Sequence, residues 1–466
     1  MDDAVRQSLI DLCQSHGVGI LDDAVRLDAF LHDMCPGRNA EIHCLGMAVR
    51  EGVVSDLRNA DKQGGFSGST RARLAERLVQ RLGMRDEAAA WTVAACAAAL
   101  GLADISPAPT AVSAPARPAA SAPRSAPAMF RGGPRRTGAF DVAHPPTLSR
   151  RLWRFATKGQ VRSSPVFSGG RLLFGSGDGR FFCLNAATGA ELWQVRTGGP
   201  VLSDPAAADG MVFFGSNDGG IYAVDVASGR GRWRLETGAT VSGGFTLANG
   251  LVYASDDDGR LYAVDAVTGS VRWRSDEGTV TGETALDADT LYVGVEDDSY
   301  CLLALDPWTG REHWRMELGA AAWFSPVVGD GLVYICDWQG VVAGVHCASG
   351  QASWRSSADT SVTTCPLLAA GTLVLAGEDG DVFALDAQRG ALFWHEELDE
   401  GVIASPVAAG SNLYIAGLDG GIFRLDMGTG RIASTADCGE PIFSTPTLAN
   451  GALYVGCDDG VLYAFG

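Results

Sequence analysis

The sequence predicts an all-β eight-bladed β-propeller with four-stranded blades, preceded by a small all-α helical bundle domain. Three observations support this fold class. Seven tryptophans recur at intervals of 40 or 41 residues, Asp-Gly pairs separate short apolar segments within these intervals, and the first hundred residues carry apolar side chains three and four positions apart. A fixed period of roughly 20 to 50 residues is the signature of a repeat architecture. We predict a helical bundle at 1–104, a flexible linker at 105–128 and a propeller at 129–466.

The first segment is predicted to form a compact bundle of about five helices. Apolar positions with helical spacing start at Val5 and recur in segments that begin near Leu21, Ala40, Thr70 and Asp86. Pro36-Gly37 and Gly52 are the expected stops. Its histidines, His16, His32 and His43, are isolated in the sequence, so we expect solvated or core side chains and no metal or catalytic set. By analogy with other terminal bundles, we expect an adaptor domain.

The linker at 105–128 consists almost wholly of Pro, Ala, Ser and Arg. A segment of this composition buries too little apolar surface to fold, so a semi-extended tether is expected. The two domains would then move independently. A role as a PxxP-type proline-rich ligand is the alternative, although the segment lacks a clear recognition motif.

Composition and the chain start indicate the compartment and the classes of partner. Residues 151–466 contain 39 acidic and 19 basic residues, and the whole chain has a net charge of −19, which disfavours nucleic acid and anionic membranes as partners. The first residues lack the basic and apolar regions of a secretory signal, and no apolar run is long enough to span a bilayer. We therefore expect a cytoplasmic location. The 11 cysteines include no C-x-x-C pair and are expected to be buried and unpaired.

The repeat itself predicts the blades. Its tryptophans are Trp153, Trp193, Trp233, Trp273, Trp314, Trp354 and Trp394, and Thr435 takes the eighth position. A glycine stands four residues before each tryptophan from Trp193 onward. In the unit 201–235, strands are expected at 201–205, 211–215, 221–225 and 232–235, with Asp218-Gly219 as a two-residue hairpin turn. Four strands joined in this way make one propeller blade.

The count of repeats predicts a closed ring. Inner strands are expected to begin near Val161, Val201, Val241, Val280, Ala321, Ser361, Val402 and Pro441. The last unit ends at 462–466 without a tryptophan strand, whereas an unpaired tryptophan strand at 151–155 precedes the first inner strand. Pairing these two segments would remove both exposed sheet edges. We predict that the closing strand lies at about 150–156.

These motifs resemble the pyrroloquinoline-quinone (PQQ)-type propeller repeat, over about 129–466. The segment from Met129-Phe130-Arg131-Gly132 to Thr137-Gly138 is similar to the lead-in common before such propellers. The resemblance covers quinoprotein dehydrogenases, the outer-membrane assembly lipoprotein BamB and bacterial sensor fusions. An enzyme of the family implies a Ca²⁺ site, a catalytic aspartate and often a vicinal disulfide, together with long insertions. This sequence has no Cys-Cys pair, short repeats and no export signal, so we expect no cofactor and no enzyme.

Acidic runs leave a metal site open as an alternative. They are Asp256-Asp257-Asp258, Glu296-Asp297-Asp298, Glu378-Asp379 and Asp458-Asp459. Calcium requires such clustered oxygens. Each run nevertheless coincides with a predicted hairpin turn, where aspartate side chains bond to the backbone, and this is the interpretation that we favour.

Departures from the repeat provide the candidate binding residues. Trp323 and Phe324 replace small residues in the fifth blade, Trp338 replaces the turn aspartate beside Asp337, and Tyr300 belongs to the fourth blade. Exposed aromatic side chains on an acidic rim are typical of an interaction hot spot. The alternative is that they fill a wide central channel. Glu283 and Asp204 take inner-strand positions and are expected at the mouth of that channel.

The favoured hypothesis is a non-catalytic recognition or scaffold protein. Its propeller would bind a protein or small ligand on the turn rim, and its helical domain would recruit a signalling or defence-type protein partner. The alternatives are a quinone-dependent oxidoreductase with PQQ and Ca²⁺, and a sugar or metabolite sensor that uses Trp323 and Trp338.

Overall fold

A computed structural model describes residues 3–100 and 127–466, except 17, 23–25, 28–29, 32–33, 36–38, 51, 63–73, 76, 79–85, 276–278, 297–298, 323 and 359. The chain divides into two compact units, a helical one near the N-terminus and a larger one that contains all described strands. The predicted linker lies almost entirely outside the described residues.

The helical unit contains α1 (Asp3–His16), a 3₁₀ turn η1 (Val18–Asp22), α3 (Asn39–Arg50), α4 (Val53–Lys62) and α6 (Asp86–Ala99). One apolar core joins them, with Leu9, Leu45, Leu57 and Val93 almost fully buried. Helix α4 was missing from our prediction, which stopped at Gly52. Gly52 has a positive φ of 75° and ends α3, and the buried Val53 and Leu57 then start a second amphipathic helix. No helix among the described residues is both long and apolar enough to cross a bilayer.

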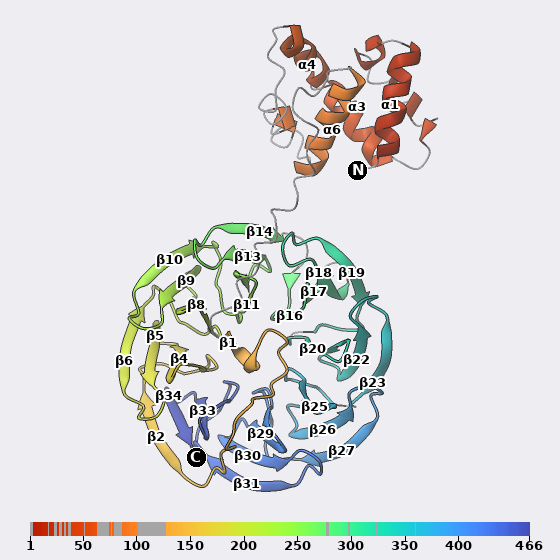
Figure 1. The fold of residues 1–466 in the computed structure, drawn as a ribbon. Coiled ribbons are helices and arrows are strands. Elements are labelled where there is room, and N and C mark those ends of the chain that lie inside the picture. The colour runs from red at the N-terminus through yellow and green to blue at the C-terminus, as the bar shows by residue number, and fades with distance from the viewer. Residues whose placement is uncertain are drawn as a thin grey trace. The chain divides into compact units, whose positions relative to one another are not determined.

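The second unit is an eight-bladed β-propeller, as predicted (Figure 1). The first four blades contain β3 (Val166–Ser168), β4 (Arg171–Ser176), β5 (Arg180–Asn185) and β6 (Glu191–Arg196); β7 (Ala206–Ala208), β8 (Met211–Gly215), β9 (Gly220–Asp225) and β10 (Gly231–Glu236); β11 (Thr246–Ala248), β12 (Leu251–Ser255), β13 (Leu261–Asp265) and β14 (Val271–Ser275); and β15 (Thr279–Val280), β16 (Ala285–Asp287), β17 (Thr290–Glu296), β18 (Tyr300–Leu305) and β19 (Glu312–Glu317).

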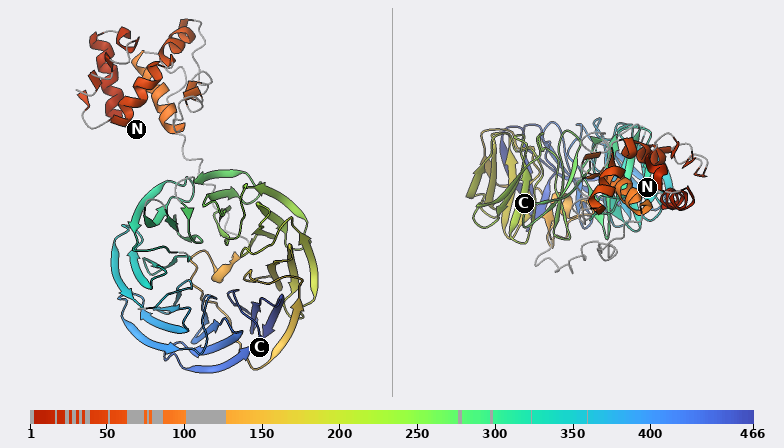
Figure 2. Two further views of the ribbon diagram at one scale, coloured as in Figure 1. Left: turned by 180° about the vertical axis from the view of Figure 1, so that it is seen from behind. Right: turned by 90° about the horizontal axis from the view of Figure 1, so that it is seen from above.

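The next three blades contain β20 (Val327–Gly329), β21 (Leu332–Cys336), β22 (Val341–His346) and β23 (Ala352–Ser357); β24 (Leu367–Ala369), β25 (Thr372–Ala376), β26 (Asp381–Asp386) and β27 (Leu392–Glu397); and β28 (Val407–Ala409), β29 (Asn412–Ala416), β30 (Gly421–Asp426) and β31 (Ile432–Asp437). The eighth contains β32 (Thr447–Ala449), β33 (Ala452–Gly456), β34 (Val461–Phe465) and, as its outer strand, β2 (Arg151–Ala156). Figure 2 shows the ring of blades from behind and from above.

The predicted closure of the ring is confirmed. β2 pairs antiparallel with β34, with Trp153 opposite Ala464, so the first complete strand of the propeller and the last strand of the chain share one sheet. This pairing supplies each segment with the hydrogen-bonding partner that it lacks in the sequence.

In most blades the inner strand starts about five residues later than predicted, whereas in the fourth blade β15 (Thr279–Val280) lies at the predicted start. In the second blade the inner strand is β7, and 201–205 is irregular backbone that bends along the channel. Pro205 has no N–H group to donate, and this bend accepts hydrogen bonds from the preceding blade, from Ser163 Oγ to the Ser203 carbonyl and from Ser164 N–H to Asp204 Oδ1.

The seven repeat tryptophans join neighbouring blades. Trp193, for example, donates from Nε1 to the Val226 carbonyl of the next blade at 2.9 Å and lies against Gly229. A Cβ on Gly229 would lie 2.8 Å from the Trp193 ring, so only glycine allows this approach. Equivalent Nε1 bonds of 2.9 to 3.0 Å occur at Trp153, Trp233, Trp273, Trp314, Trp354 and Trp394.

The eighth position of this series was misassigned. Arg424 pairs with Ser434 as Ala384 pairs with Trp394, so Ser434 occupies the tryptophan position and not Thr435. Ser434 donates from Oγ to the carbonyl of Thr147 at 2.7 Å. The incoming segment around Thr147 therefore covers the place where a tryptophan would dock.

The lead-in crosses the inner strands on one side of the ring. β1 (Ala128–Met129) pairs with β7, and a short turn η2 (Phe130–Gly132) follows. Carbonyl groups of the lead-in then accept hydrogen bonds from the inner strands of four further blades: Pro134 from Leu286, Arg135 from Val328, Thr137 from Leu368 and Gly138 from Ala408. Figure 1 shows β1 and the following turn, in orange, at the centre of the ring. The lead-in thus closes one end of the channel.

Candidate functional site

A ring of polar side chains surrounds the channel at one level of the propeller. In five of the blade junctions a backbone N–H donates to the side chain at the equivalent position of the next blade, at 2.5 to 3.3 Å. The bonds run from Ser164 to Asp204, Ser325 to Cys365, Cys365 to Ser405, Ser405 to Thr445 and Thr445 to Ser164. Small polar residues are therefore needed at this level to link the blades.

A cavity of about 210 Å³ lies within this ring. Phe130 of the lead-in contributes to its lining. The wall combines hydroxyl and carboxyl groups with apolar and aromatic side chains: Arg162, Ser164, Leu202, Asp204, Ser242, Glu283, Phe324, Ser325, Cys365, Ile403, Ser405, Phe443 and Thr445. A concave site with a few convergent polar groups is the usual form of a small-molecule site.

Three of the predicted residues meet in this cavity, namely Asp204, Glu283 and Phe324. Glu283 fills the space above Gly244, where a Cβ would collide with its carboxylate. The carboxylate accepts a hydrogen bond from Ser325 Oγ and lies 3.2 Å from Arg136 Nη2. Glu283 therefore fills the space that a side chain at Gly244 of the third blade would occupy, and its carboxylate faces Arg136 of the lead-in.

Arg136 of the lead-in binds residues of two blades at this end of the channel. Its side chain is fully buried and donates to the carbonyls of Thr284, Phe130 and Phe245, at 3.1 to 3.2 Å, in addition to its ion pair with Glu283. The guanidinium also lies over the Phe130 ring, 5.1 Å from its centroid. The sequence analysis identified the lead-in but did not predict that Arg136 is buried and binds the channel wall. The adjacent arginines, Arg135 and Arg136, were the sequence feature that could have indicated it.

Asp204 takes the position of a hydroxyl group in the ring. Its Oδ1 accepts the Ser164 N–H at 2.5 Å. Burial, and then the nearby negative charge of Glu283, raise the pKa of Asp204 to about 8, although the Ser164 bonds and Arg136 oppose this. The carboxyl group is therefore mostly protonated at neutral pH.

This shift predicts a pH-dependent stability. Between about pH 4 and pH 8 the folded chain holds a proton on Asp204 that the unfolded chain loses, so stability falls as pH rises through this window and levels off above it. Asp204→Asn should flatten the fall, because asparagine keeps the acceptor but does not titrate. Thermal unfolding between pH 5 and 9 measures this effect. Asp141→Asn, at an exposed carboxylate, should retain the slope of the unmodified chain.

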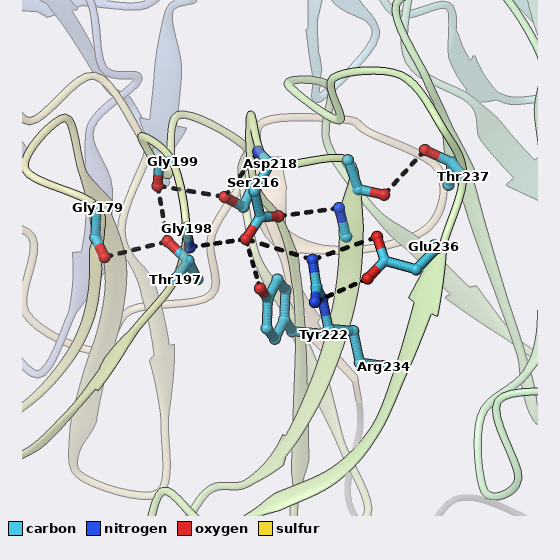
Figure 3. Close-up of polar contacts among 12 residues, drawn as sticks. Gly179, Thr197, Gly198, Gly199, Ser216, Asp218, Tyr222, Arg234, Glu236 and Thr237 are labelled. Carbon is cyan, nitrogen blue, oxygen red and sulfur yellow. Dashed lines mark hydrogen bonds and ion pairs between the residues drawn. The ribbon is translucent and has the colours of Figure 1, made fainter.

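The aspartates of the turn rim bond to backbone groups and neighbouring side chains. Asp218 accepts hydrogen bonds from Gly198 N–H of the preceding blade at 2.7 Å, Gly220 N–H at 3.0 Å and Tyr222 Oη at 2.6 Å (Figure 3). Burial would raise the pKa of Asp218, but the Tyr222, Gly198 and Gly220 bonds and Arg234 together lower it. These contacts match the turn interpretation, and no group of three or more metal-ligating side chains occurs among the described residues.

The other predicted residues that the structure describes do not line the cavity. Trp338 is 43% exposed, and its position corresponds to Gly177 and not to the turn aspartate, because Gly340 N–H bonds to Asp337 O as Gly179 bonds to Ser176 O. Asp337 is 3% exposed, and its Oδ1 accepts two backbone N–H groups of its own turn. Tyr300 starts β18, opposite Glu296. Trp323 lies outside the described residues.

Comparisons with known proteins agree on the propeller. BamB from Moraxella catarrhalis is 20% identical, with a TM-score of 0.59 over 68% of this chain and 99% of that chain. The quinohemoprotein alcohol dehydrogenase from Comamonas testosteroni is 15% identical, with a TM-score of 0.62 over 72% and 80%. The computationally designed Ika8 protein is 17% identical, with a TM-score of 0.59 over 68% and 99%. At these identities the likeness shows the fold alone.

The sequence comparison supports the same relationship. No curated protein sequence matches the chain. A family model described as "Outer membrane protein assembly factor BamB" matches residues 142–275, 257–404 and 378–466, which together cover more than half of the chain. The resemblance noted from the repeat is thereby confirmed, and the chain belongs to this BamB-like family of PQQ-type propeller repeats.

Proposed function

We propose that this chain is a non-catalytic recognition protein whose propeller binds a small, uncharged, hydroxyl-bearing molecule in the channel cavity. The observation that carries the proposal is the convergence of hydroxyl, carboxyl and aromatic side chains from several blades on one concave site. Such a site can donate and accept hydrogen bonds around a ligand while Phe324 and Phe443 cover its apolar faces.

Charge pairing in the cavity favours an uncharged ligand. Glu283 is paired with Arg136, and Arg162 is paired with Asp458 through two bonds of 2.9 and 2.6 Å. Asp204 is mostly protonated at neutral pH because its pKa is raised to about 8. A charged ligand would therefore displace an existing ion pair or enter without a partner of opposite charge, which is costly in a partly buried site.

The size of the cavity favours a small ligand. Its volume of about 210 Å³ lies below the roughly 300 to 1,000 Å³ of pockets for drug-sized molecules. Monosaccharides and short polyols combine small size with many hydroxyl groups. For the helical unit, we propose recruitment of a protein partner, on the analogy of small terminal bundles stated above.

Calorimetric titration of the full chain with glucose, galactose, myo-inositol and glycerol tests the proposal. We expect at least one of them to bind, and Phe324→Ala and Ser325→Ala to weaken that binding about tenfold each, which corresponds to about 1.4 kcal/mol. Trp338→Ala, on the rim outside the cavity, is the matched control and should leave binding unchanged.

Two results would contradict this function. Either none of the neutral ligands binds, or gluconate and inorganic phosphate bind more tightly than the neutral compounds. Loss of binding in Trp338→Ala but not in Phe324→Ala would place the site on the turn rim, as the hypothesis favoured from the sequence has it.

The quinone-dependent alternative finds less support in the residues of the cavity. PQQ is a planar tricarboxylate that requires cationic partners and, in enzymes that resemble this fold, a Ca²⁺ site. The described lining offers two carboxyl groups, and its one arginine is already bound to Asp458. These residues do not fit the group, so we assign no redox step to the site.

A further inference from the structure

At each blade junction that the structure describes, two equivalent residue positions lie beneath the turn rim. One ends or follows the fourth strand of a blade, and the other stands 19 positions later, at the end of the second strand of the next blade. At the junction of the eighth and first blades these residues are Thr157 and Ser176. Ser176 Oγ donates to Thr157 Oγ1 at 3.0 Å.

Cys438 and Cys457 occupy this position at the junction of the seventh and eighth blades. Cys438 N–H bonds to Gly420 O at 2.9 Å, as Thr157 N–H bonds to Gly460 O at 2.7 Å. Cys457 O accepts two backbone N–H groups, from Val161 at 3.0 Å and Gly460 at 3.1 Å, and Ser176 O accepts the corresponding pair. Equal backbone geometry makes the two thiols face each other as the two hydroxyls do.

The chemical setting agrees with direct contact between the thiols. A hydrogen bond with the Cys438 thiol, followed by burial, raises the pKa of Cys457. Cys457 is fully buried, whereas Cys438 is partly exposed. An oxidant in solution therefore reaches Cys438 first, and Cys457 stands behind it.

The fold does not require sulfur at this place. The equivalent pairs at the other described junctions are Thr197 with Ser216, Thr237 with Asp256, Leu318 with Asp337, Ala358 with Gly377 and Leu398 with Gly417. Residues with hydroxyl, carboxyl or apolar side chains, and glycine, all occur at these two positions. Among these junctions, two cysteines meet only between the seventh and the closing blade.

We propose that Cys438 and Cys457 are an oxidisable dithiol whose disulfide joins the seventh blade to the blade that closes the ring. With hydrogen peroxide as oxidant, the Cys438 thiolate attacks one peroxide oxygen, the O–O bond breaks, and a sulfenic acid and one water result. Cys457 Sγ then attacks the Cys438 sulfur and loses its proton, and the hydroxyl group leaves as a second water. Two thiols lose two electrons and two protons, and peroxide is reduced to two waters.

The disulfide would cross-link a short loop that contains β32 and β33, and so hold the last strands of the chain on the ring. A cross-link of this kind restricts the unfolded chain and stabilises the folded one. The inference is independent of the channel ligand, because neither cysteine lines that cavity.

Oxidation of the full chain with hydrogen peroxide, followed by maleimide labelling under denaturing conditions and peptide mass spectrometry, tests the proposal. We expect two of the 11 thiols to escape labelling, a peptide linked through Cys438 and Cys457, and its disappearance after dithiothreitol. The midpoint of thermal unfolding should rise on oxidation.

The double variant Cys438→Thr with Cys457→Ser is the matched control, because it recreates the Thr157–Ser176 pair. It should unfold at the temperature of the reduced chain and show no rise with peroxide. Cys438→Ser alone should abolish the linked peptide. The proposal is overturned if both cysteines remain fully labelled after peroxide treatment that oxidises free glutathione, or if either is linked to another cysteine instead.

Discussion

Replacing Arg136 with alanine is expected to lower the free energy of unfolding of the propeller by about 3 to 5 kcal/mol. The substitution leaves Glu283 without its cationic partner in a mostly buried place, and three backbone carbonyls lose their donor. Denaturant unfolding followed by tryptophan fluorescence measures the change, because every tryptophan except Trp91 lies in the propeller segment.

The neighbouring residue provides the control for this prediction. Arg135 pairs with Asp287 at 2.7 Å, but its side chain is 58% exposed, so Arg135→Ala should cost at most about 1 kcal/mol. Arg136→Met combined with Glu283→Gln should recover part of the loss, since it removes both buried charges. Equal effects of Arg135→Ala and Arg136→Ala would show that the buried arginine does not hold the lead-in to the channel.

Gly350→Ala is expected to destabilise the propeller by about 3 kcal/mol. Gly350 has a φ of 70°, a region that L-residues adopt at a cost of about 1 to 2 kcal/mol. A Cβ there would also lie 2.6 Å from the Trp314 ring, so the tryptophan must leave its dock, which adds about 1 to 3 kcal/mol. The same fluorescence measurement follows this change, with Trp314 as a direct reporter.

Gly371→Ala separates the two contributions. Gly371 has a similar φ of 77°, but a Cβ at this position would meet no other atom within 4 Å. This variant should therefore lose only the backbone part, about 1 to 2 kcal/mol. If both variants lose the same amount, the contact between Trp314 and Gly350 contributes nothing to blade docking.

The repeat made the architecture predictable because a blade cannot bury its faces alone. The tryptophan spacing and the Asp-Gly turns led directly to the blade number, and the unpaired strand around Trp153 led to the closure with β34. Strand boundaries were less predictable. Val201 and Leu202 look like strand residues, but they lie in irregular backbone before the Pro205 bend, where Val201 is buried between blades and Leu202 lines the cavity.

The candidate site was only partly predictable for a similar reason. Asp204, Glu283 and Phe324 stood out because they depart from small residues at repeated positions, and they do line one cavity. Arg136 did not stand out, since its burial depends on a left-handed backbone, with φ of 59°, and on strands from distant blades. Cys438 and Cys457 become a pair only when the 19-residue offset between neighbouring blades is known.

The pairing of β2 with β34 also sets the order in which the chain can finish folding. A ribosome makes β2 early and β34 last, so the early strand waits without its neighbour until nearly all of the propeller has been synthesised. During synthesis its unpaired edge is open to strands of other nascent chains, and a product that stops before Val461 keeps that edge permanently. A chain truncated just before β34 would thus be an association-prone polypeptide, although its ring lacks only one strand.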